Sequence, residues 1–350
     1  MLSETLKDIK PSGIRKFFDL LADMGDVTAL TVGQPDFVTP WHIREAAINS
    51  LERGQTYYTS NSGLPELRRE ICNYMRRRFN LEYLPEEVLV TVGGSEAIDV
   101  CIRALTNPGD EVIIPMPSFV CYEPIVRMAG ATPVIINTKA ENGFKLTPEE
   151  LACAITPRTK MLVLPYPNNP TGAILTREEL EALAAVLAGH DIAVLSDEIY
   201  AELTFDQRHV SIANIESVKD RVIIASGFSK AYAMTGWRLG YLLGPKAWIA
   251  QMTKLHQYAI MCAPTVSQFA AVEALREGDE DIAEMKAEYN RRRVFICEGL
   301  RRIGLPTLMP EGAFYIYPYI GGFGLTSEEF CQRLLMEEKC AIVPGTAFGE

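Results

Sequence analysis

The chain contains 350 residues, which is enough for a large hydrophobic core and for two domains. Apolar residues make up 48% and charged residues 23% of the sequence, the proportions of an ordinary globular protein. The formal net charge of −11 argues against nucleic acid and against an anionic membrane as partners, although a local basic pocket can still bind an anion. Residues 1–10 are too charged for a secretory signal, and no apolar run approaches the roughly 20 residues of a membrane span.

The cysteines and histidines predict neither a disulfide framework nor a metal site. The eight cysteines are scattered and form no C-x-x-C pair, so we expect reduced, buried thiols in a cytoplasmic protein. The four histidines are far apart and show no ligand spacing such as H-E-x-x-H, so no metal ion is expected.

The N-terminal region, residues 1–45, is expected to form an extended arm. Within it, Gly33 begins a Gly-Gln-Pro loop whose backbone can approach a ligand, although an ordinary loop is the simpler interpretation. A helix is predicted over residues 65–79, because a proline and a glutamate open an amphipathic pattern there. The three arginines at positions 76–78 of this helix are expected to form a solvated face.

Short apolar runs that alternate with helical segments predict an α/β fold. Such runs indicate strands of a mostly parallel sheet that is covered by helices on both faces. The runs are Val88–Val92, Val112–Ile114, Val134–Ile136, Met161–Leu164, Ile192–Leu195 and Val222–Ala225. Helices are expected from residue 246 to beyond 290, broken by an exposed acidic turn at 277–281. A strand at 313–318 and a helix at 327–339 would complete a smaller α/β domain with the arm.

Five of the six runs end in turn-forming or polar residues. In parallel sheets ligands bind beyond the carboxyl ends of the strands, so these residues are predicted to meet in one site. They include the glycine turn and helix start at Gly94 and Ser95, which suits a phosphate, an aromatic that could stack on a planar ring, and polar groups after the later strands. The remaining members are Phe119, Asn169, Asp197, Tyr200 and the segment 226–240.

The segment 226–240 carries one lysine, Lys230, among small and apolar neighbours, with Arg238 eight positions on. A lysine in an apolar pocket has a lowered pKa and can act as an amine nucleophile, and a nearby arginine would lower that pKa further. The arginine would also present a planar fork suited to a phosphate. Two solvated surface charges are the alternative, but the pair also fits a pyridoxal phosphate site.

Three motifs in family-like order give the sequence a resemblance to a known family. They are N-P-x-G at 169–172, D-E-x-Y at 197–200 and S-K-(x)₇-R-x-G at 229–240. The sequence resembles the class I/II aminotransferases of fold type I, above all the bacterial branch with aspartate, aromatic and N-acetyl-diaminopimelate aminotransferases. The resemblance implies pyridoxal 5′-phosphate as cofactor. It also implies ping-pong transfer of an amino group from an L-amino acid to a 2-oxo acid, with 2-oxoglutarate as the expected acceptor.

The resemblance implies a role for each matching residue. Lys230 would bind the cofactor covalently and move the substrate proton, and Asp197 would keep the ring nitrogen protonated. Asn169 and Tyr200 would hydrogen-bond the phenolic oxygen of the ring. Phe119 would stack on the ring, where many relatives have tryptophan.

The remaining residues would contact the phosphate and the substrate. The phosphate contacts would be Gly94, Ser95, Ser229 and Arg238. Tyr58 resembles the tyrosine that reaches the phosphate of the neighbouring subunit, which implies a homodimer with shared active sites. The backbone of Gly33, with Asn169, would contact the substrate carboxylate.

The family pattern also divides the chain and leaves one gap. The expected parts are the arm at 1–45, a large cofactor-binding domain at 46–289 and a small domain at 290–350. The family's carboxylate-binding arginine lies beyond a Phe-Gly pair, here at 348–349, and no residue matches it, so the small domain is expected to be incomplete. A carbon–sulfur lyase of the same fold remains the alternative reaction, and a non-catalytic cofactor-binding regulator is a more distant one.

Overall fold

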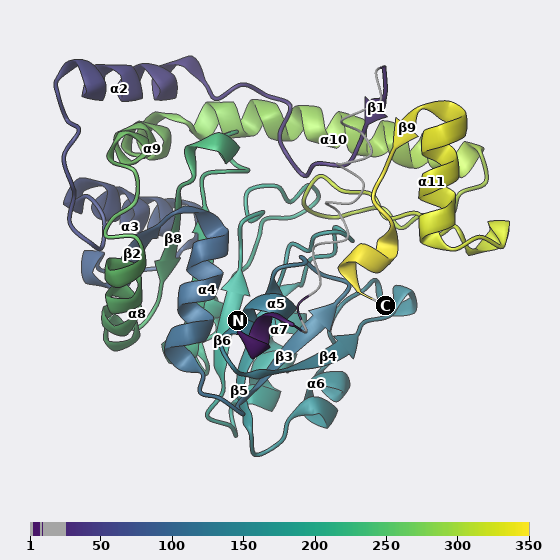
Figure 1. Cartoon of the computed structure of the whole chain (residues 1–350), viewed down its shortest axis with the longest axis horizontal. Coiled ribbons are helices and arrows are strands. Elements are labelled where there is room, and N and C mark those ends of the chain that lie inside the picture. Colours follow the sequence, from purple (N-terminus) through teal and green to yellow (C-terminus); the bar gives the residue numbers. More distant parts are fainter. Residues whose placement is uncertain (1–2, 8, 10–25, 350) are drawn as a thin grey trace.

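A seven-stranded sheet forms the centre of the computed structural model, which describes residues 3–7, 9 and 26–349 (Figure 1). Six of its strands overlap the predicted apolar runs, and the order across the sheet is β2-β8-β7-β6-β5-β3-β4. The strands are β2 (Val88–Thr91), β3 (Glu111–Met116), β4 (Thr132–Asn137), β5 (Thr159–Leu164), β6 (Ala193–Asp197), β7 (Val222–Gly227) and β8 (Gly240–Leu243).

The sheet is mostly parallel, as predicted, with β8 as the exception. Strand β8 pairs antiparallel with both β2 and β7, and the other neighbours pair in parallel. Strand β8 was not predicted, because its four residues follow the lysine segment too closely to stand out as a separate run. Gly227 and Gly240 are register partners, and a Cβ on Gly227 would lie 3.0 Å from the Cα of Gly240. Two glycines therefore let these backbones approach closely.

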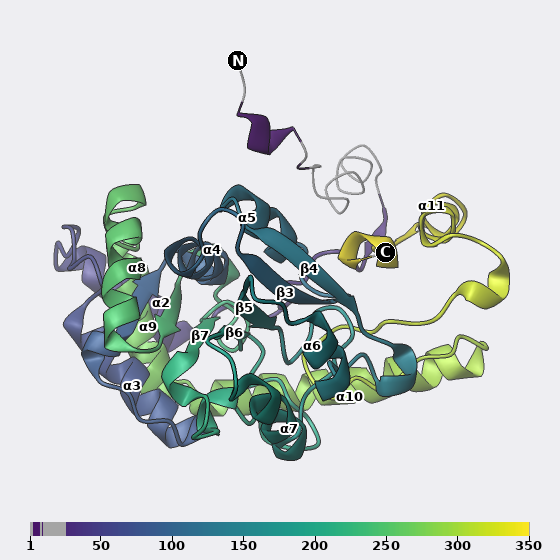
Figure 2. The same cartoon turned by 90° about the horizontal axis from the view of Figure 1, so that it is seen from below.

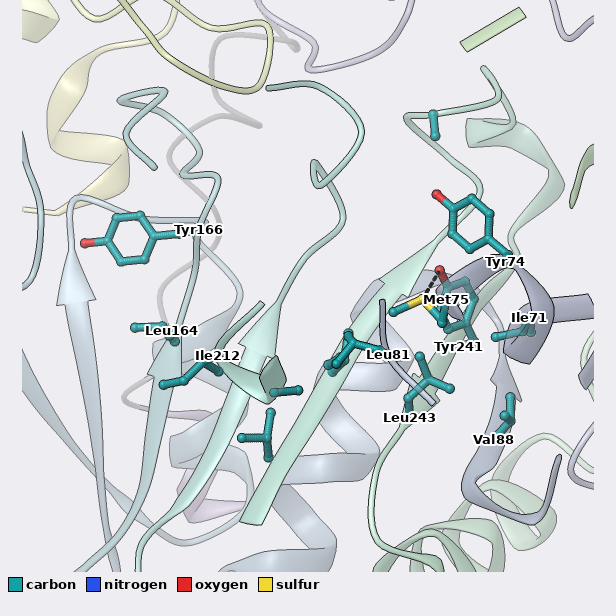
Figure 3. Packing of buried hydrophobic residues seen from close by; sticks show 14 of the residues in the cluster. Ile71, Tyr74, Met75, Leu81, Val88, Leu164, Tyr166, Ile212, Tyr241 and Leu243 are labelled. Atoms are coloured by element: carbon teal, nitrogen blue, oxygen red, sulfur yellow. Dashed lines mark hydrogen bonds between the residues drawn. The ribbon is translucent and has the colours of Figure 1, made fainter. Parts of the chain in front are cut away.

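Side chains alternate between two hydrophobic cores, because successive residues of a strand point to opposite faces of the sheet. Val88 and Val90 join one core, whereas Leu89 joins the other. Helices α4 (Gly93–Leu105), α5 (Tyr122–Met128) and α8 (Lys246–Ala259) cover the Leu89 face. Helices α3 (Pro65–Phe79), α6 (Pro148–Ala154), α7 (Arg177–Leu187) and α9 (Thr265–Glu277) supply the opposite core. Figure 3 shows Ile71 and Met75 of α3 beside Tyr241 and Leu243 of β8.

The remaining elements lie beyond the helical layers. Helix α2 (Trp41–Glu52) packs on α9, and the long helix α10 (Asp279–Arg302) extends from α9 toward α11 (Ser327–Glu338) (Figures 1 and 2). Beside α11, β1 (Thr28–Ala29) and β9 (Cys340–Ala341) form a second, parallel sheet of two strands. Short 3₁₀ turns occur at Glu4–Leu6, Pro85–Glu87, Ala140–Asn142, Ile212–Asn214, Lys219–Arg221, Thr235–Trp237, Gly321–Phe323 and Gly345–Phe348.

Helices α6, α7 and α11 begin at the same local signal, a threonine followed three residues later by a glutamate. In each, the threonine oxygen accepts from the backbone N–H of the glutamate, and the glutamate accepts from the backbone N–H of the threonine. This capping box satisfies two backbone donors that the first helical turn leaves unpaired. Within the described residues, no helix is both long and apolar enough to cross a membrane.

The strand predicted at 313–318 is wrong. An isolated bridge joins Thr204 to Gly312, just before the segment, and none of residues 313–318 lies in a strand. Ala313 has a φ of 57°, in the left-handed region, so the backbone turns where an extended strand would have to begin. The aromatic side chains of Phe314 and Tyr315 instead pack into a third hydrophobic cluster near the lysine segment.

Three smaller expectations also need correction. Arg78 is not simply solvated, since its Nη2 lies 2.6 Å from Oε2 of the buried Glu202, to which Tyr74 also donates at 2.7 Å. The helix break near residue 277 is confined to Gly278, because Asp279 already begins α10. The cysteines are free, as expected, but not uniformly buried, and Cys153 is exposed.

Candidate active site

The predicted site residues lie at one edge of the sheet. Asp197 ends β6, Asn169 follows β5, Lys230 follows β7, and Gly94 lies in the first turn of α4, which begins after β2. The edge arises from topology, because the carboxyl ends of the parallel strands point the same way. The site is therefore built by segments that are far apart in the sequence.

Lys230 is largely shielded from solvent, and its charged ammonium form is destabilised. Its pKa is lowered to about 8, mainly because burial disfavours the charged form and also because the guanidinium of Arg238 is nearby, whereas the carboxylate of Asp197 opposes the shift. Its Nζ donates a hydrogen bond to the backbone oxygen of Gly33, which joins the N-terminal loop to the site. The Nζ also lies 5.8 Å from the ring centroid of Tyr200 and 5.6 Å from that of Phe314.

Asp197 is a buried carboxylate with two hydrogen bonds. Tyr122 donates from its hydroxyl to Oδ2 at 2.7 Å, and the backbone N–H of Ile199 donates to Oδ1 at 3.2 Å. Burial, together with the charge of Glu198, raises the pKa of Asp197 above its ordinary value, and the two donors and the charge of Lys230 offset part of this shift. The arrangement supplies a negative group that can face a cationic or protonated ligand atom.

Arg238 and the first turn of α4 form a cradle suited to an anion. The guanidinium lies so close to Gly93 that a Cβ on that glycine would come within 2.5 Å of Nη2. Gly240 must also lack a side chain, because a Cβ added there would lie only 2.6 Å from the carbonyl carbon of Gly93. Because α4 begins at Gly93, its free backbone N–H groups and its dipole favour a negative ligand beside the arginine.

A group of phenol and backbone atoms closes the site on the side of the N-terminal loop. The hydroxyls of Tyr200 and Tyr315 are hydrogen-bonded to each other. The hydroxyl of Tyr315 also lies against Gly33, where an added Cβ would overlap it. Burial raises the pKa of both phenols, that of Tyr315 to about 12, so both remain protonated at neutral pH.

The other predicted residues differ in how closely they join this group. Asn169 is half-buried in the loop after β5, Phe119 is half-buried after β3, and Ser229 is buried beside Lys230. Ser95 is exposed in the first turn of α4. Tyr58 exposes 79% of its surface and makes no hydrogen bond or ring contact with the described part of its own chain. It is not brought into the site within this protomer.

The residues fit a group that carries both a phosphate and a polar ring. The side-chain oxygen of Asn169 is buried and has no hydrogen-bond partner among the described residues, which is unusual for a polar atom. An amide can present either its oxygen or its nitrogen, so it can serve a ring oxygen. The cradle at Gly93 and Arg238 would take the phosphate, and Asp197 would meet a ring nitrogen. Pyridoxal phosphate has this set of groups.

Three contributors to the site were not predicted from the sequence. Tyr122 was passed over although its neighbour Phe119 was selected, and Tyr315 was placed in the strand that does not form. Gly93 was not singled out, although its neighbour Gly94 was. A glycine pair and a tyrosine near a motif are weak signals alone, because their importance depends on which distant side chain they meet.

The chain matches the family model for aminotransferase class I and II over residues 25–350, and it therefore belongs to that family. The family is dependent on pyridoxal phosphate, so the protein is a pyridoxal phosphate-dependent aminotransferase.

Individual relatives agree over nearly the whole chain. A putative aminotransferase of Bacillus subtilis, YugH, is 52% identical over 99% of this chain and 90% of its own length. A probable N-acetyl-LL-diaminopimelate aminotransferase of the same organism is 45% identical, covering 99% of this chain and 88% of its own. Among solved structures, the aspartate aminotransferase of Rhizobium meliloti has a TM-score of 0.97 at 37% identity, covering 100% of this chain and 92% of its own.

Proposed function

We propose that this aminotransferase acts through Lys230, in a ping-pong exchange between an L-amino acid and a 2-oxo acid. The main support for this proposal is the environment of Lys230, whose shielded amine has a pKa of about 8 and interacts with the buried carboxylate of Asp197. A neutral amine can attack a carbonyl and can also accept a proton, whereas an ammonium group can do neither. Arg238 and the first turn of α4 form a cradle suited to a phosphate at the same edge of the sheet.

When bound, the cofactor supplies an aldehyde that captures amino groups and a ring that accepts electrons. The chain's own residues would hold it and move protons. Arg238, Ser229, Ser95 and the backbone of Gly94 would bind the phosphate. Asp197 would keep a proton on the ring nitrogen.

The rest of the pocket would orient the ring and the substrate. Asn169 and Tyr200 would hydrogen-bond the ring oxygen, and Phe119 would stack on the ring. The backbone of Gly33, together with Asn169, would contact the substrate carboxylate. Lys230 in its neutral form would take the proton from the substrate Cα and return it to the cofactor side.

Covalent capture tests the role of Lys230. Borohydride reduction of the protein with pyridoxal phosphate should fix the cofactor to the peptide that contains Lys230, as read by mass spectrometry. Lys230→Ala should abolish this adduct and the transaminase activity, whereas Lys254→Ala, which changes an exposed lysine of α8, should retain both. An adduct of equal yield in the Lys230→Ala protein would contradict the assignment.

The donor is proposed to be an aromatic, an acidic or an N-acetyl-diaminopimelate-type L-amino acid, and the acceptor 2-oxoglutarate. The support is the naming of relatives at 40–45% identity, which include aspartate, aromatic and N-acetyl-LL-diaminopimelate aminotransferases. A screen of these donors against 2-oxoglutarate, with kcat/KM as the measure, separates the three. Rapid release of pyruvate and ammonia from a cysteine conjugate without any 2-oxo acid would favour the lyase reaction instead.

We further propose a homodimer in which Tyr58 serves the partner's site. Its support is an exposed apolar surface formed by the loop that contains Tyr57 and Tyr58 and by the end of α8, where Tyr258 exposes 87% of its surface. Two hydrogen bonds tie these segments together, from Thr265 Oγ1 to the oxygen of Tyr57 and from Asn61 Nδ2 to the oxygen of Met261. A monomer rarely leaves such a patch uncovered.

Mixing two inactive variants tests the shared site. If Tyr58 acts across the dimer, a hybrid of Tyr58→Ala and Lys230→Ala subunits contains one site with both changes and one site with neither. Unfolding and refolding the mixture should therefore restore activity that each variant lacks, up to about one quarter of the normal value for random assembly. Hybrids that form, as shown by mass spectrometry, but remain inactive would contradict the shared site.

The domain division and the location remain proposals as well. We infer a large domain at 46–289 and a small one at 290–350 with the arm. Helix α10 passes through residue 290 and would connect the two domains. A cytoplasmic location is inferred from the cysteines, all eight of which are free, as expected in a reducing compartment.

A further inference from the structure

Tyr122 donates the shorter of the two hydrogen bonds that Asp197 receives. The phenol is only 2% exposed, and its hydroxyl lies 2.7 Å from Oδ2 of Asp197. The second bond, from the backbone N–H of Ile199, reaches the other oxygen at 3.2 Å. One donor therefore comes from the chain that follows β6, and the stronger one comes from α5, a separate helix.

The surroundings of Tyr122 fix its hydroxyl in place. Tyr122 is the first residue of α5, and Ile125 and Val126 of the same helix are buried in the core on that face of the sheet. The ring of Phe119 meets the ring of Tyr122 edge to face, with centroids 6.0 Å apart. Because both rings and the helix are packed, the phenol has little freedom to turn away from the carboxylate.

The chemistry of the pair favours an ionised Asp197. Burial disfavours the charged carboxylate, and a donor to that carboxylate counteracts the burial. Burial and the adjacent carboxylate raise the pKa of Tyr122 well above its ordinary value, so the phenol keeps the proton that it donates. The other titratable groups that act on this pair are Lys230, Glu198, Cys121 and Tyr200. Lys230 also favours the carboxylate, whereas Glu198 opposes it.

We propose that Tyr122 is a positioning residue, whose hydroxyl holds Asp197 in the orientation and the ionised state needed to pair with a protonated ring nitrogen. The inference rests on the proposed role of Asp197 and extends it to a residue that would act through that carboxylate. Phe119 would face the ring, and Tyr122, three residues later, would hold the acid. One short segment after β3 would thus serve the ring in two ways.

The affinity of the apoprotein for pyridoxal phosphate, measured by equilibrium titration from pH 5.5 to 8.5, tests this inference. Tyr122→Phe keeps the ring and removes the hydroxyl. We expect the dissociation constant to rise about tenfold, which corresponds to about 1.4 kcal/mol. The loss should be larger at the acid end, because Asp197 without its donor binds a proton at higher pH. The acid limb of kcat/KM should move to higher pH in the same direction.

A matched control exists in Tyr74 of α3, which donates to the buried Glu202 at the same distance, 2.7 Å, and belongs to the core on the opposite face of the sheet. Tyr74→Phe deletes a phenol–carboxylate bond of the same kind and should leave cofactor affinity and its pH dependence unchanged. Asp197→Asn, alone and combined with Tyr122→Phe, completes a double-mutant cycle. In the Asp197→Asn background, the tyrosine change should have no further effect on affinity.

The outcomes separate the two levels of the argument. A loss in Tyr122→Phe that disappears in the Asp197→Asn background supports the inference. If Asp197→Asn weakens binding and Tyr122→Phe does not, the inference fails and the proposed role of Asp197 stands. If the two losses simply add, Tyr122 acts independently of Asp197 and the inference also fails. If Asp197→Asn leaves affinity unchanged, the proposed role of Asp197 fails, and the inference fails with it.

Discussion

The acidity of Lys230 gives the sharpest quantitative test of the site. With a pKa of about 8, roughly 9% of the amine is neutral at pH 7, against roughly 0.03% for an ordinary lysine. The apoprotein should therefore react with an amine-directed reagent about 300-fold faster at Lys230 than at an exposed lysine of equal accessibility. Reductive methylation in a pH series, quantified by mass spectrometry of each lysine peptide, measures this difference directly.

Two substitutions should change this reactivity in opposite directions. Arg238→Gln removes the like charge, so the pKa of Lys230 should rise and its reaction at pH 7 should slow roughly three- to tenfold. Asp197→Asn removes the charge that opposes the shift, so the same reaction should become faster. Arg276→Gln, on the outer surface of α9, is the control and should change nothing.

The reasoning fails if Lys230 titrates like an exposed lysine in the unmodified protein. It also fails if both substitutions move the reactivity the same way, because the two neighbours carry opposite charges. Circular dichroism of each variant confirms that the fold is retained before the rates are compared.

Three further substitutions probe stability and the anion cradle. Both ring nitrogens of His42 lie 2.9 Å from carboxylates of α9 and α10; partial burial lowers the pKa of His42, but these bonds leave it raised above 6.5. His42→Gln should therefore lower the free energy of unfolding in urea by about 1 kcal/mol at pH 6 and by less at pH 8.5. An equal loss at both pH values would contradict a contribution from the charged form of His42. Gly240→Ala, whose Cβ would collide with Gly93, should weaken cofactor binding severalfold, whereas Gly236→Ala has open space and should not. Arg78→Met removes the charged partner of the buried carboxylate of Glu202, so the free energy of unfolding in urea should fall by about 3 kcal/mol. The same change at the exposed Arg76 should alter it by no more than about 0.5 kcal/mol.

The sequence predicted the architecture better than it predicted the details of the site. Apolar runs of three to five residues separated by helical patterns were sufficient to predict the mostly parallel sheet, because strands covered on both faces are built mainly from apolar side chains. The strand expected at 313–318 failed for a local reason, since the left-handed backbone at Ala313 cannot be read from an alanine. Strand β8 was missed because four residues carry little periodic signal.

By itself, the sequence determined the family and was sufficient to propose which residues carry the chemistry, since the order and spacing of three motifs are properties of the chain. Only the tertiary structure decided what each residue meets. Lys230 donates a hydrogen bond to the backbone of Gly33, which is 197 positions away in the chain. Asp197 accepts a hydrogen bond from the hydroxyl of Tyr122, which is 75 positions away. The pKa of a buried group depends on such neighbours and on its exclusion from water, and both arise only when distant segments pack together.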